Sequence, residues 1–306
     1  MSLLLPELLC PAGDEAALRA AVDSGANAVY LGYRVFGARA SAVNFDAEAL
    51  EAAVRYAHLY HVRVYVTVNT LVKPDEMQDL RAALGEIAAT GADAAIVQDL
   101  GVAAMVRREF PALALHASTQ MAICNAEGAR LARSLGFSRV VLAREMSRSE
   151  IAAIASQAQI ETEVFVHGAL CMCVSGQCYM SSVIGERSGN RGLCAQPCRL
   201  PFSSGRKGDS GYALSLKDLS LAHRVQELVQ LGVDSFKIEG RMKRPEYVAA
   251  AVSQFKQALE GQQADMDLMA AVFSRSGFTQ GYFDGKLGQE LSLIHISEPT
   301  RPRLIS

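Results

Sequence analysis

The chain has 306 residues, 50% hydrophobic and 20% charged, and this composition excludes a mainly disordered protein. Lys and Arg number 30 against 32 Asp and Glu, so the formal net charge is −2 and any contact with nucleic acid must come from a local basic patch. No apolar run reaches the roughly 20 residues of a membrane helix, and the opening MSLLLPELLCPAGDE lacks the basic residues of a signal peptide. We therefore expect a cytoplasmic protein without membrane contact.

Short β-like runs alternate with amphipathic helical runs along the chain. The predicted strands are short and mostly apolar: Glu7–Cys10, Ala28–Gly32, Val62–Val68, Ala94–Val97, Leu113–Ala117, Arg139–Ala143, Glu163–His167 and Ser235–Ile238. Helices are predicted between them from capping residues and helical spacing: Asp14–Ser24, from Asp46, from Pro74, Leu100–Phe110, Ala126–Leu135, Ser149–Gln157, Leu221–Leu231 and Pro245–Leu259.

Strands that alternate with helices imply parallel pairing, and the span 7–260 matches the roughly 250 residues of a (β/α)8 barrel. The rhythm breaks over 168–211. We therefore predict an α/β, TIM-barrel-like fold with a Cys-rich insertion after the seventh strand, and with Leu214–Leu216 as an extra element. A doubly wound sheet is the alternative, although CPAGDE after the first strand is not the expected G-x-G-x-x-G.

The predicted catalytic domain is 1–260, with 168–211 as its Cys-rich cluster loop. Residues 261–289 are expected to begin a C-terminal region that is truncated here. The last residues, 290–306, read ELSLIHISEPTRPRLIS and continue neither a helical nor a strand pattern. They resemble translated sequencing-adapter read-through, so we expect a non-native tail.

Five of the seven cysteines lie within 171–198, which favours metal binding or catalysis over a disulfide framework. Cys171 and Cys178 are separated by six residues, and Cys194 and Cys198 by three; Cys173 is an additional thiol. Four converging thiolates can hold zinc or an iron–sulfur cluster. The six-residue gap is looser than that of a zinc knuckle and favours a 4Fe–4S cluster, with zinc as the alternative.

The strand Ser235–Ile238 leads into three charged candidates for catalysis. Strand C-termini face the active site of such barrels, and alternation turns Lys237 and Glu239 to the same side. We predict both at the barrel mouth, with Arg241 as an anion clamp. A solvated charged face or a structural ion pair is the alternative for these residues. His167 at the end of the seventh strand is a fourth candidate, with a purely structural role as its alternative.

A basic loop and several polar strand ends complete the candidates. The loop 186–207 has a net charge of +4, which predicts phosphate contacts from Arg187, Arg191 and Arg199; a solvated basic loop is the alternative. Polar side chains expected at or beyond other strand ends are Asn69, Gln98, His116, Ser118, Gln120, Arg144 and Glu145.

Several motifs resemble the collagenase-like peptidase family U32. They are VFVHGALCMCVSGQCYMSS, NRGLCAQPCR, VDSFKIEGRMKRPEYV and the opening ELLCPAGDEAAL, followed by a stretch that contains Tyr30 and Arg39. The resemblance extends from about Glu7 to Phe283. It implies a 4Fe–4S cluster on Cys171, Cys178, Cys194 and Cys198. Cys173 departs from the usual pattern of this family.

The resemblance also implies a function, because the family includes hydroxylases of ribosomal RNA and tRNA. We expect iron–sulfur-dependent hydroxylation of a pyrimidine in RNA, with prephenate as co-substrate. One alternative is a Cys–His peptidase with Cys171 or Cys178 as nucleophile and His167 as base, although no H-E-x-x-H or G-x-S-x-G motif is present. Another is a subunit of oxygen-independent ubiquinone hydroxylation that works with a homologous partner.

Overall fold

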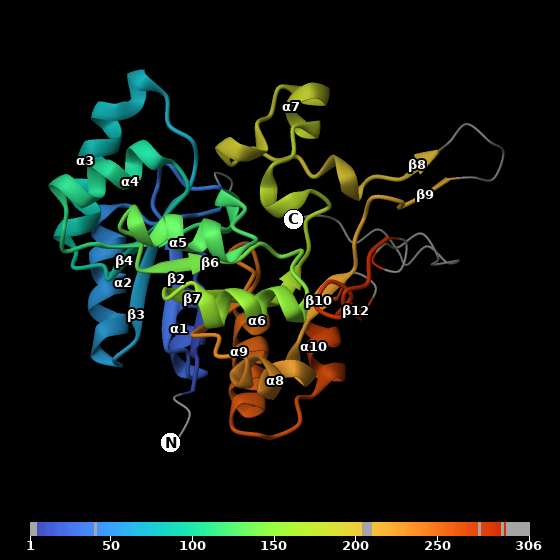
Figure 1. Cartoon of the computed structure of the whole chain (residues 1–306). Helices are drawn as coiled ribbons and strands as arrows, with labels where there is room; N and C mark the ends of the chain where they lie inside the picture. The colour runs from blue at the N-terminus through green and yellow to red at the C-terminus, as the bar shows by residue number, and fades with distance from the viewer. Residues whose placement is uncertain (1–4, 40–41, 204–209, 275–276, 289–290, 292–306) are drawn as a thin grey trace.

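Eight parallel strands close into a barrel in the computed structural model, which describes residues 5–39, 42–203, 210–274, 277–288 and 291 (Figure 1). The barrel strands, in spatial order, are β1 (Glu7–Pro11), β2 (Ala28–Gly32), β3 (Arg63–Val68), β4 (Ala94–Val97), β5 (Ala114–Ala117), β6 (Arg139–Val141), β7 (Glu161–Ala169) and β11 (Ser235–Ile238). β11 pairs in parallel with both β7 and β1 and so closes the ring. The predicted TIM-barrel-like α/β fold is confirmed.

Helices surround the barrel and begin where the sequence provides caps. They are α1 (Glu15–Asp23), α2 (Ala47–Leu59), α3 (Met77–Ala89), α4 (Leu100–Glu109), α5 (Ala126–Ser134), α6 (Arg148–Gln157), α8 (Val225–Gln230) and α9 (Pro245–Leu259). The Asp14 carboxylate accepts from the Ala17 amide, and Asp46 does the same for Ala49. Each helix buries an apolar stripe against the strands, and β1 and β2 are buried throughout because helices cover their outer faces.

The chain leaves the barrel after β7 and returns at β11. Between them lie η3 (Val174–Gly176), α7 (Met180–Gly185), η4 (Gly189–Arg191), η5 (Pro197–Arg199) and the hairpin of β8 (Phe202–Ser203) and β9 (Ser210–Gly211). In Figure 1 this segment, with α7, stands beyond one end of the barrel. That end is the C-terminal one, because β7 runs directly into the segment.

The expected extra element at Leu214–Leu216 is wrong by a few residues. The additional strand is β10 (Asp218–Ser220), which runs antiparallel to the end of β7 and pairs with β12 (Phe278–Thr279). The Arg199 guanidinium explains the difference, because it donates hydrogen bonds to Ser215 Oγ and Leu216 O and holds these residues as a loop.

The region after α9 packs onto the barrel. α10 (Met266–Val272) lies against α9, and its Met269 is buried. Of the expected non-native tail, only Leu291 belongs to the described residues, and its side chain is 2% exposed. Residues 290 and 292–306 lie outside them, as do Arg206 and Lys207 of the basic loop. No helix within the described ranges is long and apolar enough to cross a membrane.

A charged network fills the barrel interior toward the N-terminal ends of the strands. Lys237 Nζ lies 2.7 Å from Glu163 Oε1, and Arg139 Nη1 lies 3.2 Å from Glu163 Oε2 and 2.5 Å from Glu7 Oε1. All four side chains are buried. Burial raises the pKa of Glu163, but Lys237 and Arg139 outweigh it and lower the pKa overall. We predicted Lys237 at the mouth of the barrel, but it lies below the mouth and is enclosed in a structural ion pair.

Lys237→Met should lower the free energy of unfolding by about 3–5 kcal/mol, because it leaves a buried carboxylate without its cation. Arg139 cannot replace Lys237, since Arg139 is already shared with Glu7. Urea denaturation followed by circular dichroism at pH 7 measures the change. The control is Arg19→Ala, which removes an exposed ion pair with Glu15 and should leave stability nearly unchanged. A loss no larger than that of the control would contradict the ion-pair role.

Candidate active site

The carboxyl ends of three strands bring two arginines onto one carboxylate. Glu239 follows β11, and its Oε1 lies 3.0 Å from Nη2 of Arg39 in the loop after β2. Its Oε2 lies 3.1 Å from Nη2 of Arg144, which follows β6. Glu239 was predicted at the mouth, whereas Arg39 and Arg144 had no assigned role. In the sequence, Arg144 was marked only by its position after a predicted strand, and Arg39 by its place in a stretch that resembles the family.

Arg241 adds a third cation to this group. Its Nη1 donates to Thr67 Oγ1 at 2.7 Å, near the end of β3, and its side chain is buried. The guanidinium passes so close to Gly32 that a Cβ there would lie 2.7 Å from Nη1. Glycine at the end of β2 therefore leaves the space that Arg241 occupies. Arg241 lies at the mouth, as predicted.

The arginines determine the charge of Glu239. Burial alone raises the pKa of this carboxyl, but Arg39, Arg144 and Arg241 outweigh it and hold the pKa at about 2. Burial, followed by repulsion from Arg39, lowers the pKa of Arg241 to about 10. At neutral pH the three cations thus face one carboxylate. We name this group, Arg39, Arg144, Arg241 and Glu239, the arginine site; its uncompensated positive charge suits an anion.

Buried polar atoms around the same rim have no partner within the described part of the chain. They are Gln98 Oε1 after β4, Gln120 Oε1 after β5 and Nε of Arg144 after β6. Buried polar groups are nearly always hydrogen-bonded in folded proteins. Unpaired groups that gather at the strand ends of a barrel are therefore expected to meet a bound molecule.

The four predicted ligand cysteines gather in the segment after β7. Burial is the main cause that raises the pKa of Cys198; Arg199 opposes it, and the thiols of Cys171, Cys194 and Cys178 add to the rise. Cys194 is exposed and the other three are partly buried. Among the described residues, no three Cys, His, Asp or Glu side chains lie close enough to hold a single metal ion.

Backbone amides point at two of these sulfurs. The Met180 amide donates to Cys178 Sγ at 3.3 Å, and the Gln196 amide donates to Cys194 Sγ at 3.4 Å. Such bonds stabilise a thiolate more than a neutral thiol. Cys194 also lies near the arginine site: Glu239 is the main cause that raises the pKa of Arg39, and Cys194 contributes to the rise.

His167 does not face the arginine site. Its ring packs against Tyr247 and Phe255 of α9 and Phe278 of β12, with centroids 5.3–5.7 Å apart, and its side chain is 1% exposed. A shift of register between β7 and β11 explains this placement: Lys237 pairs with Phe165 but Ile238 pairs with His167. The extra residue in β7 breaks the alternation and turns His167 outward. The expected place beside the substrate is thus corrected.

The three arginines predicted to bind RNA differ in their surroundings. Arg199 donates to Ser215 Oγ and to the carbonyls of Leu216 and Leu170, so its guanidinium is engaged inside the protein. Arg191 forms an ion pair with Glu76 and donates to Leu71 O. Arg187 is exposed, and its Nε donates to Leu193 O at 3.0 Å.

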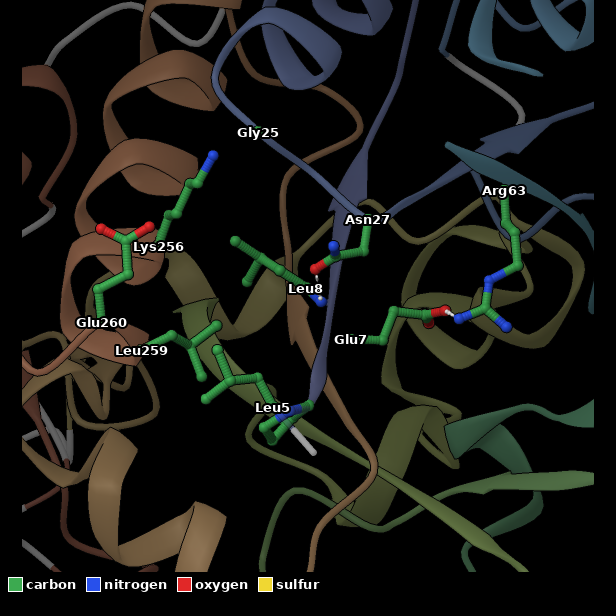
Figure 2. A pocket seen from close by; sticks show the side chains of 10 residues that line it. Leu5, Glu7, Leu8, Gly25, Asn27, Arg63, Lys256, Leu259 and Glu260 are labelled. Atoms are coloured by element: carbon green, nitrogen blue, oxygen red, sulfur yellow. Dashed lines mark hydrogen bonds and ion pairs between the residues drawn. The ribbon is translucent and has the colours of Figure 1, made fainter. Parts of the chain in front are cut away.

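Two hollows lie at opposite ends of the barrel. Figure 2 shows one of about 290 Å³ at the N-terminal strand ends, where Glu7 pairs with Arg63 and Asn27 Oδ1 accepts from the Leu8 amide. A hollow of about 530 Å³ lies beside β2 and α3 and is lined by Gly37 and Arg191, among others. The second adjoins the arginine site, because a Cβ on Gly37 would lie 3.9 Å from Arg241 Nη1.

A closed (β/α)8 barrel, with a charged C-terminal mouth and a segment of grouped cysteines after its seventh strand, defines the class of this protein. The chain belongs to peptidase family U32, whose family model matches residues 13–293. In the solved structure of the U32 peptidase Mk0906 the same fold is present, with a TM-score of 0.54 and 16% identity over 78% of this chain and 95% of that one.

Relatives with assigned names have different activities. The 23S rRNA 5-hydroxycytidine C2501 synthase of Escherichia coli is 39% identical over 90% of this chain and 42% of its own length. The tRNA hydroxylation protein P1 of Bacillus subtilis is 36% identical over 85% of this chain and 64% of its own. A collagenase of Porphyromonas gingivalis is 35% identical, over 97% and 78%. The chain thus spans less than two thirds of the first two relatives.

His167→Phe should weaken the pH dependence of stability. Burial lowers the pKa of His167 to about 4, against about 6.5 in the unfolded chain. The unfolded state binds the extra proton between these values, so the free energy of unfolding falls as the pH drops through this window. Phenylalanine keeps the ring packing and removes the titration. Between pH 6.5 and 5 the variant should lose about 1–2 kcal/mol less than the wild type in urea denaturation. Equal losses would contradict a buried neutral histidine.

Proposed function

We propose that this chain takes part in iron–sulfur-dependent, prephenate-dependent hydroxylation of a pyrimidine in ribosomal RNA or tRNA in the cytoplasm. The observation that carries the proposal is the adjacency of two sites, since Arg144 pairs with Glu239 and also donates to the carbonyl of Ala169, two residues before Cys171. An anion in the arginine site would lie next to the grouped thiols. The names of the E. coli and B. subtilis relatives, an rRNA hydroxycytidine synthase and a tRNA hydroxylation protein, support RNA as the substrate.

Cys171, Cys178, Cys194 and Cys198 are the proposed ligands of a 4Fe–4S cluster. The donor set fits, because the thiols of Cys171, Cys178 and Cys194 all lie close enough to Cys198 to affect its pKa, and two of the four sulfurs already accept backbone N–H bonds of the kind that tune iron–sulfur clusters. The six-residue gap between Cys171 and Cys178 is looser than that of a zinc knuckle, and a cube of four irons spans a larger volume than a single zinc ion. When bound, such a cluster supplies one-electron transfer.

The arginine site is the proposed place for prephenate. Prephenate carries two carboxylates, and planar guanidinium groups pair well with carboxylates. Arg39, Arg144 and Arg241 leave two positive charges beyond that of Glu239. Glu239 keeps the guanidinium groups in position when no ligand is bound, so little reorganisation is needed for binding. The unpaired oxygens of Gln98 and Gln120 are available to the ligand hydroxyl group.

Arg187 is the proposed phosphate contact in the cysteine segment. It is exposed in the segment that stands beyond the C-terminal end of the barrel, whereas Arg191 and Arg199 hold this segment to the barrel. A pyrimidine that reaches the site must be unstacked, as in a loop of ribosomal RNA or tRNA. Arg191 and Arg199 support RNA binding through the shape of this segment more than through direct contact.

The peptidase alternative has less support in the geometry. A Cys–His peptidase needs its base within hydrogen-bond reach of the nucleophile. The His167 ring is enclosed by Tyr247, Phe255 and Phe278 on the outside of the barrel, which is not a place from which it can serve Cys171 or Cys178 at the mouth. The collagenase name of the P. gingivalis relative is the observation that favours this alternative. A homologous partner subunit stays a prediction.

Protein purified without oxygen should be brown and should contain about four irons and four sulfides per chain. Cys194→Ser and Cys178→Ser should each lose most of the iron, because each removes a ligand. The matched control is Cys124→Ser, which changes an exposed cysteine outside the segment and should keep the iron. Cys173→Ser tests the additional thiol and should also keep it. Iron-free wild-type protein, or equal iron in all four variants, would contradict the proposed ligands.

Deletion of the gene in its host should remove a hydroxylated pyrimidine from total RNA, measured by nucleoside mass spectrometry. The wild-type gene should restore it. Arg241→Ala should restore less than a tenth of it with normal iron content, because the anion clamp is lost. Arg187→Ala should restore part of it, and Arg55→Ala, which changes an exposed arginine on α2, should restore it fully. An unchanged nucleoside profile after deletion, with peptide cleavage that needs Cys171, would favour the peptidase.

A further inference from the structure

The segment between Cys171 and Cys178 contains a buried serine in an unfavourable conformation. Ser175 has φ 25° and ψ 58°, in the left-handed region that side chains with a Cβ rarely adopt, and it is 1% exposed. A conformation of this kind persists only where the surroundings hold it in place, and it is concentrated at functional sites.

A single carboxylate accepts from both hydrogen-bond donors of this serine. The Ser175 amide donates to Glu145 Oε1 at 2.9 Å, and the Ser175 hydroxyl donates to Glu145 Oε2 at 2.8 Å. The amide of Arg144 then donates to Ser175 Oγ at 3.2 Å. Thr119 Oγ1, after β5, also donates to Ser175 Oγ at a longer 3.5 Å, so the shorter bonds all come from two consecutive residues of the loop after β6. The cysteine segment, which follows β7, rests on that loop through these three hydrogen bonds.

Arg144, the neighbour of Glu145, belongs to the arginine site. Its Nη2 pairs with Glu239 at 3.1 Å, and its Nη1 donates at 3.1 Å to the carbonyl of Ala169, two residues before Cys171. The guanidinium also lies over the ring of Phe165, with its central carbon 4.0 Å from the centroid. One dipeptide therefore has one side chain in the arginine site and the other on the cysteine segment.

We infer that Glu145 and Ser175 are positioning residues that couple the arginine site to the grouped cysteines. The α-carbons of residues 144 and 145 are about 3.8 Å apart, so a shift of Arg144 on a bound anion moves the backbone that holds Ser175. In the sequence, Ser175 lies between two of the proposed ligands, Cys171 and Cys178. This inference rests on the proposed function, because it concerns a cluster on those thiols and prephenate in the arginine site.

The coupling is measured as the effect of prephenate on the cluster. The full chain is purified without oxygen, and its midpoint potential is determined by titration followed by electron paramagnetic resonance, with and without saturating prephenate. Calorimetry gives the dissociation constant of prephenate in parallel. In the wild type, prephenate should change the potential and the resonance spectrum, because coupling between two sites is mutual.

Three variants test the residues that carry the coupling. Glu145→Gln and Ser175→Ala should lose more than half of the shift in potential, while iron content stays normal and the dissociation constant changes by less than about threefold. Ser175→Gly removes the same hydroxyl and also relieves the left-handed backbone. Because the coupling depends on the hydroxyl, this variant should behave like Ser175→Ala. The matched controls are Glu127→Gln and Ser134→Ala, both on the exposed side of α5, and they should keep the full shift.

Two results would overturn the inference alone. One is a full prephenate-induced shift in both Glu145→Gln and Ser175→Ala with normal iron. The other is loss of iron in these variants, which would make Glu145 and Ser175 merely structural. Wild-type protein that contains no iron, or that does not bind prephenate, would contradict the proposed function itself, and the inference would fall with it.

Discussion

β11 pairs with β1 on one side and β7 on the other, and this double pairing determines where the charged residues of the barrel lie. The strand alternates inward and outward, so Lys237 and Glu239 enter the interior at two heights. The lower position meets Glu163, and the upper one meets Arg39 and Arg144. Closure of the ring thus creates both the buried ion network and the site at the mouth.

The two heights have different electrostatic character. In the lower network Glu7 and Glu163 face Arg139 and Lys237, so the four charges balance and burial is tolerated. At the mouth a single carboxylate faces three arginines, and the surplus positive charge has no counterpart in the group. A balanced interior favours stability, whereas an unbalanced mouth favours the binding of an anion. This division follows the usual one between the two faces of a (β/α)8 barrel.

Side chains that the sequence predicted to bind other molecules instead hold the segment after β7 to the mouth of the barrel. Arg199 binds the carbonyls of Leu170 and Leu216, and Arg191 pairs with Glu76 of the loop after β3. Glu145 holds the buried Ser175. These contacts attach the segment with the grouped cysteines to the C-terminal end of the barrel. The net charge of the segment therefore predicted more free basic side chains than the structure shows, because Arg191 and Arg199 attach the segment to the barrel.

The sequence by itself determined the barrel. Helix caps such as Asp14 and Asp46, and the period of apolar residues in strands and helices, depend only on residues that are close in the chain. They therefore predict the elements before any packing is known. The sequence also marked the cysteine pairs as candidate ligands and Glu239 as a candidate residue of the barrel mouth. Only the tertiary structure decided which partners meet. Arg39 and Arg144 come from loops after different strands, and only closure of the barrel brings them to Glu239. The turn of His167 away from the mouth depends on one extra residue in β7, a feature of pairing with β11 that no local pattern records.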